Sequence, residues 1–537
     1  MSSRNPIESV AYTELTRRRI LQGAGAGLLA VGGGSLLAAC GGGSSGATGS
    51  ATAGGEEGKP VAGGIMKVGA QGGSNTDTLD ANAVLTNTDF ARAAQLYDPL
   101  LRLSVKGHPE NVLATDVTPN KTATEWTIKL RPNVKFHNGK PLTAKDVLYT
   151  FNRVIKGNYS AAVILGSLDL NQSKAVDDLT VLLKFKSPYS FFAEAIAARF
   201  ETLYIVPVGY NPKKPVGCGP FKLKSFTPGR ESITVKFDEY WDAPKPYLDE
   251  IHTINVNEET AQVSALQAGQ VDVIDNLTAA SVATLESTGL VVSVAKTGGW
   301  TPLCMRVDKP PFNDNRVREA LKLAVDRQGM IQSVFSGNGN IANDYFGKFT
   351  PAVETVELPQ HEQDIEKVKS LLKSAGQENL SIQLYTSEIA PGMEQTAEVL
   401  STQAEAAGIK ISVIKQPSTE YFARSYLKVP FGMDYWPYQP YLVAAGQANV
   451  TGGVFSFTKF SDPTYDKYYK EATSTLDEKK QEEIIHEMVK IDWGEGGNII
   501  PYNFPIIDAW ATNVHGIVPS VLGQPLGNFQ FKNYWIS

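Results

Sequence analysis

The sequence predicts an α/β protein with mixed sheets, built from at least two packed units. The chain has 537 residues, more than one simple core holds at about 100–200 residues per domain. From Val61 onward, short β-like runs alternate with amphipathic helical segments. Hydrophobic residues make up 42% and charged residues 20% of the chain, which is typical of a globular protein and excludes a mostly disordered one.

Residues 1–39 are predicted to be an export signal that is removed from the mature protein. The string TRRRILQ, Thr16 to Gln22, resembles a twin-arginine signal and precedes a weakly apolar Gly/Ala/Leu stretch. The LAAC motif, Leu37 to Cys40, resembles a lipobox. That resemblance implies cleavage before Cys40 and a diacylglyceryl group on its thiol. The alternative is a Sec signal with an incidental cysteine.

Residues 40–60 are predicted to be the lipidated cysteine followed by a flexible Gly/Ser linker. Loss of residues 1–39 removes four arginines and two glutamates, so the charge changes from −6 to −8. An acidic protein repels anionic lipid, so only the anchor would hold it at the membrane. We therefore expect an exported protein, lipid-anchored at the cell membrane and facing the periplasm or the cell exterior.

The composition argues against several other classes of protein. Lys+Arg is 50 against Asp+Glu 56, without a long basic run, which disfavours a nucleic-acid binder. The six histidines lie far apart and form no local metal-ligand pair, and we expect no metal site and no cofactor. Three cysteines provide no disulfide scaffold. Beyond Cys40, two free buried thiols at Cys218 and Cys304 are favoured over a bond between them.

The first half of the body contains clear local signals. GGIMKVGA, Gly63 to Ala70, is predicted to be a strand, and a helix within Thr88–Leu101 ends at Asp98–Pro99. Trp126, Ile128 and Leu130 alternate with polar residues, as in a half-buried strand. Thr143 then caps a helix, with Asp146 completing a capping box.

The second half continues the alternation. One helix is predicted over Arg316–Phe335 and another near Lys479–Lys490. A strand at Ser381–Thr386, a helix through Leu400–Ala407 and a strand at Ile409–Ile414 form a βαβ pattern. Further strands are predicted at Ile233–Phe237, Glu250–Val256 and Val271–Asp275.

Six motifs occur in a fixed order along the body. They are LYDPLL, WTIKLRPNVKFHNGKPLTAKDVLYTFNRV, GCGPFKL, EYWDAPKPYLDEI, AGQVDVI and PPFNDNRVREALKLAVDR. In this order and spacing they resemble the extracellular solute-binding proteins of the peptide- and nickel-binding family (family 5), which serve ABC importers. The resemblance implies a two-lobed periplasmic-binding-protein-like fold with mixed sheets, a two-strand hinge and an extra subdomain in the first lobe. It divides the chain into lobe 1 at 61–300, lobe 2 at 301–503 and a return to lobe 1 at 504–537.

The same resemblance implies a function. Such a protein is a substrate-binding receptor, not an enzyme, that captures an extracellular solute between its lobes and delivers it to a membrane permease with its ATPase. A peptide is the first candidate for the solute. We expect the protein to be a monomer. An oligosaccharide or metal-chelate receptor of the same fold is the first alternative. A receptor retasked as a sensor or chaperone, and an exported hydrolase, stay open.

An aromatic segment, GMDYWPYQPYL, is the main candidate site. Peptide binders of the family hold an Asp shortly after a Trp, where it pairs with the peptide ammonium. With Trp436 as the matching Trp, the neutral Gln439 falls near that position, and Asp434 precedes the Trp. Flat rings with polar edges bury a ligand at low entropic cost. The predicted ligand-binding residues here are Asp434, Tyr435, Trp436, Tyr438, Gln439 and Tyr441, with packing in a loop core as the alternative.

Five further residues are candidates by position. Trp300 lies at the predicted hinge, and a core tryptophan is the alternative. Tyr502 and Phe504 lie on the predicted return crossing between the lobes. Asn75 and Asp77 end the first strand in a polar loop, where plain solvent exposure is the alternative.

Overall fold

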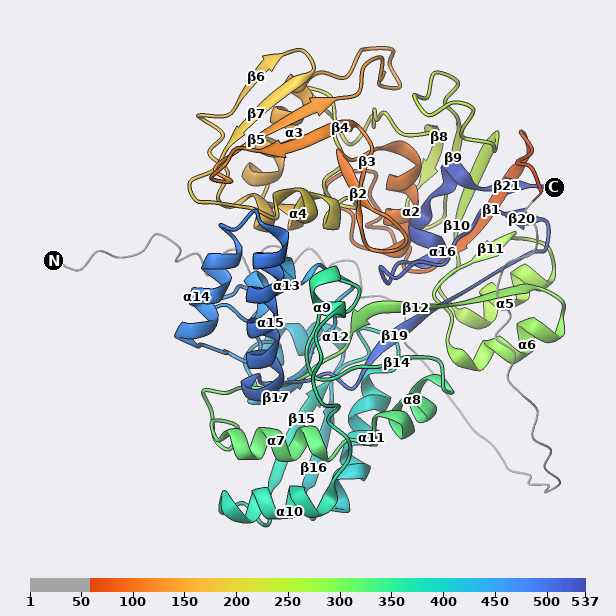
Figure 1. Cartoon of the computed structure of the whole chain (residues 1–537). Coiled ribbons are helices and arrows are strands. Elements are labelled where there is room, and N and C mark those ends of the chain that lie inside the picture. Colours follow the sequence, from red (N-terminus) through yellow and green to blue (C-terminus); the bar gives the residue numbers. More distant parts are fainter. Residues whose placement is uncertain (1–57) are drawn as a thin grey trace.

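The computed structural model describes residues 58–537 (Figure 1). The predicted export signal, Cys40 and almost all of the linker lie outside the described residues, so these assignments stay predictions. The described chain forms a two-lobed mixed α/β fold, as predicted. We call residues 58–300 and 504–537 lobe 1 and residues 301–503 lobe 2. These boundaries follow the sequence prediction and stay predictions.

The main sheet of lobe 1 mixes parallel and antiparallel pairs, in the order β12-β19-β11-β1-β10-β9-β8, with β14 paired to β19. Its central pair, β1 and β10, is parallel, whereas β9 and β10 are antiparallel. The strands are β1 (Ile65–Ala70), β8 (Phe221–Thr227), β9 (Glu231–Lys236), β10 (Glu250–Asn255), β11 (Val273–Ile274), β12 (Val291–Trp300), β14 (Asn340–Ile341) and β19 (Tyr502–Trp510). Its helices are α2 (Asn87–Leu96), α5 (Glu259–Gln267) and α6 (Val282–Ser287).

An extra subdomain in lobe 1 is built on a second sheet of order β4-β5-β7-β6. In β5 the alternating residues Trp126, Ile128 and Leu130 are buried, as the pattern predicts. The Thr143 backbone N–H donates to the Asp146 carboxylate (2.8 Å), which confirms the capping box that begins α3. The elements are β2 (Leu101–Leu103), β3 (Pro109–Asn111), β4 (Ala114–Pro119), β5 (Glu125–Leu130), β6 (Lys174–Asp177), β7 (Thr180–Lys184), α3 (Ala144–Lys156) and α4 (Phe192–Ala198).

Lobe 2 contains a sheet of order β16-β15-β17-β13-β18, in which β15 and β16 are parallel, as the βαβ pattern predicts. The helix expected over Arg316–Phe335 is two helices, because the Asp326 carboxylate caps a new helix by accepting from the Gly329 N–H (2.9 Å). The strands are β13 (Leu303–Met305), β15 (Ser381–Thr386), β16 (Lys410–Lys415), β17 (Phe431–Met433) and β18 (Asn498–Ile499). The helices are α7 (Asn315–Leu323), α8 (Arg327–Phe335), α9 (Pro351–Glu354), α10 (Ile365–Ser374), α11 (Met393–Glu405), α12 (Ser418–Glu420), α13 (Tyr441–Ala448), α14 (Pro463–Ala472) and α15 (Glu478–Glu495).

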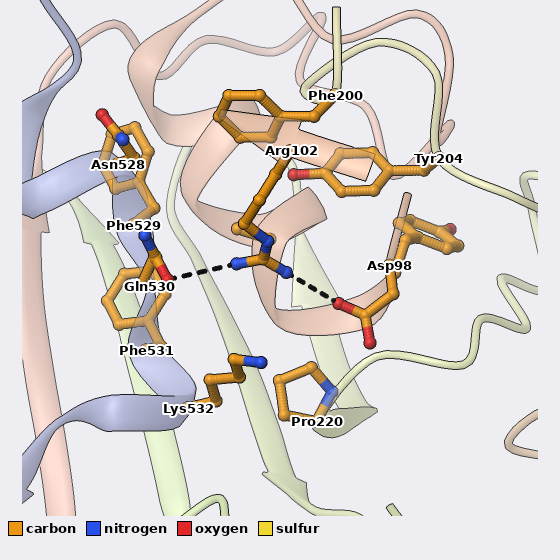
Figure 2. A pocket seen from close by; sticks show the side chains of 12 residues that line it. Asp98, Arg102, Phe200, Tyr204, Pro220, Asn528, Phe529, Gln530, Phe531 and Lys532 are labelled. Atoms are coloured by element: carbon orange, nitrogen blue, oxygen red, sulfur yellow. Dashed lines mark hydrogen bonds and ion pairs between the residues drawn. The ribbon is translucent and has the colours of Figure 1, made fainter. Parts of the chain in front are cut away.

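The C-terminal segment returns to lobe 1 and is fastened there by polar contacts (Figure 2). The Arg102 guanidinium donates to the buried Asp98 carboxylate (3.1 Å) and to Gln530 Oε1 (3.3 Å). These side chains surround a cavity of only about 10 Å³, room for about one water molecule. The segment contains β20 (Val514–His515), a left-handed turn labelled α16 (Pro525–Phe529) and β21 (Trp535–Ile536).

The largest hydrophobic core crosses the lobe boundary. It joins buried side chains of the extra subdomain, such as Phe192 and Phe200, to buried rings of lobe 2, such as Trp436 and Tyr441. In Figure 1, α4 correspondingly lies beside α13 and α14. The two lobes therefore meet in apolar contact, and this contact extends to Trp300 at the end of β12.

Candidate solute-binding site at the lobe junction

Strands β12 and β19 run antiparallel between the lobes. Their register is regular from Val291 opposite Trp510 to Lys296 opposite Pro505, and it then shifts before Trp300 pairs with Asn503. A Cβ added to Gly299, in the shifted stretch, would lie 2.3 Å from the Phe504 ring. Only glycine therefore lets this ring pack directly on the backbone of the crossing strand.

The aromatic segment of lobe 2 joins the end of β12. Trp300 and Trp436 exchange two backbone hydrogen bonds of 2.9 Å, and their rings stack 5.7 Å apart at 2°. Phe346 also stacks on Trp300 (5.5 Å) and on Tyr441 (5.1 Å). Pairwise stacking therefore connects these four rings, from the end of β12 to the start of α13.

These rings are buried in the arrangement that the structure shows. Trp300 is 2% exposed and Trp436 is 7% exposed. The cavity beside them, which Asp434 and Phe455 also line, measures about 10 Å³ and fits about one water molecule. The packing alternative therefore describes this conformation well, and a role in solute binding for Trp300 and Trp436 stays a prediction.

The other members of the segment are held by specific partners. The buried Asp434 accepts from the Tyr426 hydroxyl (2.7 Å) and from the backbone N–H of the half-buried Tyr435 (2.9 Å). The Tyr441 hydroxyl donates to Asp492 (2.5 Å). Tyr438 links the lobes, because its backbone N–H donates to the Leu522 carbonyl (3.2 Å) and its ring lies against Gly107.

Gln439 is 3% exposed and accepts a hydrogen bond from Gln447 (3.1 Å). Gln447 in turn accepts from Arg199, which lies at the end of α4 in lobe 1 (2.8 Å). The polar residue at the predicted acid position is therefore connected to the opposite lobe.

The two candidate residues in the loop after β1, Asn75 and Asp77, have different surroundings. Asp77 accepts from the fully buried Arg92 (2.7 Å) and from Asn255 (2.9 Å), whereas Asn75 is exposed beside Gly229. Burial raises the pKa of Asp77, but these hydrogen bonds outweigh it and leave the pKa below its usual value. Asp77 is thus occupied by protein partners in this arrangement.

The candidates on β19 also differ. Tyr502 is fully buried, and its hydroxyl bonds to Thr301 (2.8 Å) and Thr396 (2.5 Å) inside lobe 2. The hydroxyl of the Tyr502 side chain is therefore held by these two neighbours. Phe504, by contrast, is half-buried. The two remaining cysteines, Cys218 and Cys304, are buried free thiols, as predicted.

A cavity of about 420 Å³ lies between the lobes, beside the crossing strand β19. Lobe 1 contributes Asn276–Ala279, lobe 2 contributes parts of α8, α11 and the loop before α11, and β19 contributes Pro505 and Ile507. Its volume is in the range of small-molecule sites, which is about 300–1,000 Å³. A solute held there would touch both lobes and the hinge.

The cavity has a polar side on lobe 2. Glu388 accepts from the backbone N–H groups of Gly392 (2.7 Å) and Glu394 (3.0 Å), and so stabilises the start of α11. Lys415 pairs with Glu394 (3.3 Å) and Glu398 (2.7 Å). Val334, Phe335 and Pro391 supply apolar surface.

Sequence reasoning named none of the residues that line this cavity; the predicted Phe504 is only the chain neighbour of Pro505, which lines it. One signal was present: Glu388 and Pro391 follow the carboxyl end of a parallel strand, β15, where α/β proteins commonly bind ligands. The segments around residues 276, 334 and 391 share no sequence motif, so the sequence could not predict that they line one cavity.

The comparison with known proteins identifies the family. The family model "Bacterial extracellular solute-binding proteins, family 5 Middle" matches residues 108–481. This chain belongs to that family. The family 5 assignment confirms the resemblance seen in the six motifs.

Two curated relatives illustrate the range of the family. The nickel-binding protein NikA of Staphylococcus aureus is 25% identical over 425 residues, covering 77% of this chain and 84% of NikA. The oligopeptide-binding protein AppA of Bacillus subtilis is 25% identical over 442 residues, covering 74% of this chain and 79% of AppA.

Solved structures share the family 5 fold. The substrate-binding protein CtaP of Listeria monocytogenes superimposes with a TM-score of 0.77 at 19% identity, covering 88% of this chain and 99% of that one. AppA of B. subtilis, solved with a nonapeptide, gives a TM-score of 0.71 at 20% identity, covering 89% and 100%. Within residues 58–537, no helix has the length and apolar character needed to cross a bilayer.

Proposed function

We propose that this family 5 protein is the substrate-binding receptor of an ABC-type importer, which captures an extracellular solute, most readily a peptide, and passes it to a membrane permease. The observation that carries the proposal is the cavity of about 420 Å³ bounded by both lobes and by β19. The family match and the relatives named for peptide and nickel binding support the same function.

The mechanism follows from the two crossing strands. A solute that contacts both lobes does so only when they are closed, so its binding free energy shifts the hinge equilibrium toward the closed state. Strands β12 and β19 are the connections about which the lobes would turn, and their register shift after Lys296 is a natural place for bending. The solute is released chemically unchanged.

The solute is proposed to lie in the 420 Å³ cavity and to extend toward the aromatic segment. Opening the lobes would expose the rings of Trp436 and Tyr438, which now pack at the junction. A peptide fits a site with apolar walls and a few polar groups. A metal chelate, favoured by the NikA relative, and an oligosaccharide, favoured by the aromatic rings, are the alternatives within the same function.

A thermal-shift screen tests the function. The probes are trialanine, glutathione, nickel–histidine complex and maltotriose, each over a wide concentration range. A probe at 100 times its Kd should stabilise the folded protein by about 2.7 kcal/mol. Mass spectrometry of the recovered probe should show it intact, whereas a cleaved probe would favour the hydrolase alternative.

Two substitutions test whether the solute binds in this cavity. Ala279→Trp fills the cavity from lobe 1 and should abolish the stabilisation by the best probe. Ser287→Trp adds the same ring to the exposed end of α6, outside the cavity, and should leave the stabilisation unchanged. Unchanged binding by the Ala279→Trp variant would move the solute out of this cavity.

The membrane attachment through Cys40 and the monomeric state belong to the proposal as well. Cys40→Ser should release the exported protein from the membrane fraction into the soluble fraction. A retained Cys40→Ser variant would contradict the lipid anchor. Light scattering of the purified protein should give the mass of one chain.

A further inference from the structure

Two buried carboxyl groups lie behind the lobe-1 wall of the cavity, Asn276–Ala279. Asp275 directly precedes this wall at the end of β11, and Asp508 lies on the neighbouring strand β19. Continuing the pairing of Ile274 with Ala509 by one residue places Asp275 opposite Asp508. Asp275 is fully buried and Asp508 is 4% exposed. Like charges directly opposite each other on paired strands are destabilising, and burial strengthens their repulsion.

Neither carboxyl group has a cationic partner within residues 58–537. Asp275 Oδ1 accepts from the Gln71 backbone N–H (3.1 Å) and from Gln262 Nε2 (3.1 Å), and both donors are neutral. In the same part of the chain, the buried Asp275 Oδ2 has no hydrogen-bond partner. An ionised carboxylate is costly to bury in this way, and such a group keeps its proton instead. The surroundings therefore call for at least one proton on the pair.

Asp508 joins the cavity wall to the crossing strand and to the C-terminal turn. Its Oδ1 accepts from the Asn276 backbone N–H (3.1 Å), and its Oδ2 accepts from the Leu526 backbone N–H (2.6 Å). Asn276 and Leu526 both have left-handed backbone conformations, with φ of 55° and 48°, which are uncommon outside glycine and need fixed partners. The Leu277 backbone N–H donates to the Ile507 carbonyl of β19 (2.7 Å), so the wall continues along the same strand.

The groups around the pair favour its protonated form. Burial raises the pKa of Asp275 from 3.8 to about 7. Burial also raises the pKa of Asp508 from 3.8 to about 8, and the Asp275 charge adds to that shift. Gln71 after β1 and Gln262 on α5 face the pair with neutral groups. The C-terminal segment adds Tyr534, whose pKa is raised by burial and by the Asp508 charge. The pair therefore exchanges a proton close to neutral pH.

We propose that Asp508 is a positioning residue for the solute cavity and that it shares a proton with Asp275, so that the cavity wall is correctly placed only while the pair holds this proton. Loss of the proton leaves two facing negative charges in a buried space. Their repulsion displaces Asn276, so solute binding weakens as the pH rises. This inference rests on the proposed function for the place of the solute, whereas the shared proton is independent of it.

The shared proton is tested first without any probe. In purified protein labelled with ¹³C at the aspartate carboxyl carbon, the signals of Asp275 and Asp508 are assigned by their loss in Asp275→Asn and Asp508→Asn. Both signals of the parent should move between about pH 6 and about pH 9. In Asp275→Asn the Asp508 signal should move at a lower pH, because the facing charge is gone. Two signals that stay constant over this range overturn the shared proton.

The effect on the solute is tested by the pH profile of binding, measured by isothermal titration calorimetry with the best probe from the screen. The parent should bind this probe about 10-fold or more weakly near pH 9 than near pH 6. Asp275→Asn removes one charge and leaves both hydrogen bonds of Asp508, so it should bind as the parent does near pH 6 and keep that affinity near pH 9. Asp275→Ala removes the same charge and covers the case in which Asp275→Asn does not fold.

A matched control keeps the pair intact. Asp178→Asn removes an exposed carboxylate of the extra subdomain and should keep the pH profile of the parent. Any titration of the probe itself is common to all variants and cancels in the comparison. A parent profile without pH dependence, or an equally steep profile in Asp275→Asn, overturns the inference.

Asp508→Asn separates positioning from charge. Its amide offers one acceptor oxygen, so its NH₂ group faces one of the two backbone N–H groups that Asp508 now binds. Asp508→Asn should therefore bind the probe about 3- to 10-fold more weakly near pH 6, and without the pH dependence of the parent. Parent-like binding by Asp508→Asn near pH 6 would mean that Asp508 does not position the wall. A protein that binds none of the four probes would refute the proposed function and the positioning role, but not the shared proton.

Discussion

The Trp436 side chain offers the sharpest test of how the lobe junction is packed. From its aromatic surroundings in the sequence, Trp436→Ala is expected to abolish solute binding without unfolding the protein. The structure changes that expectation, because Trp436 is 7% exposed, stacks on Trp300 at 5.7 Å and meets the Phe455 ring edge-on at 6.0 Å. Removing it would leave a large cavity inside the core that joins the two lobes.

The magnitude follows from this burial. Truncation of a buried tryptophan to alanine costs about 3–5 kcal/mol of folding free energy. The stacked geometry accounts for about 0.5–1.5 kcal/mol of that cost. Trp436→Phe keeps an aromatic ring and the backbone bonds to Trp300, so it should lose only about 1–2 kcal/mol.

Urea unfolding followed by far-ultraviolet circular dichroism measures this loss. Denaturant is preferable to heat, because a two-lobed protein need not unfold in one thermal step. The expected order of stability is parent, Trp436→Phe, Trp436→Ala. A loss below about 1 kcal/mol for Trp436→Ala would refute the packing shown at the junction and restore the view of an open binding surface.

Three further predictions follow from the same contacts. Arg92→Met leaves the Asp77 carboxylate buried without its cation, so urea unfolding should show a loss of about 3–5 kcal/mol, and a neutral result would return Asp77 to the candidate binding residues. Burial raises the pKa of Asp492 from 3.8 to about 7, so the folded state keeps a proton that the unfolded chain releases. The free energy of unfolding should therefore fall as the pH rises between these two values, and Asp492→Asn should flatten that slope; an unchanged slope contradicts the assignment. Gly299→Ala places a methyl group 2.3 Å from a ring atom and should destabilise the protein by about 1–3 kcal/mol, whereas Gly494→Ala, in a helix with open space around it, should stabilise it by about 0.5–1 kcal/mol.

Local structure was largely readable from the chain. The alternation at Trp126, the capping box at Thr143 and the parallel strands at Ser381–Thr386 and Lys410–Lys415 all depend on residues close in sequence. The break at Asp326 was missed, because continuous apolar spacing hid a cap whose effect depends on one side-chain hydrogen bond.

The candidate site was read less completely. The aromatic segment was recognised by composition, but composition does not tell whether a ring faces solvent or a partner lobe, and Trp436 packs on Trp300 from another part of the chain. The sequence predicted Asp77 as a ligand-binding carboxylate in a loop, yet this carboxylate already pairs with Arg92 and accepts a hydrogen bond from Asn255. Tyr502 lies at the start of β19, and its hydroxyl is hydrogen-bonded to Thr301 inside lobe 2.

The amino-acid sequence by itself determined the family and the mixed α/β elements, because periodicity, caps and motif order act over short stretches. Only the tertiary structure decided which surfaces meet. The cavity beside β19 gathers several separate stretches of the chain, and the hydrogen bond from Arg199 to Gln447 joins residues 248 positions apart; such contacts arise from how the lobes pack and not from any local pattern.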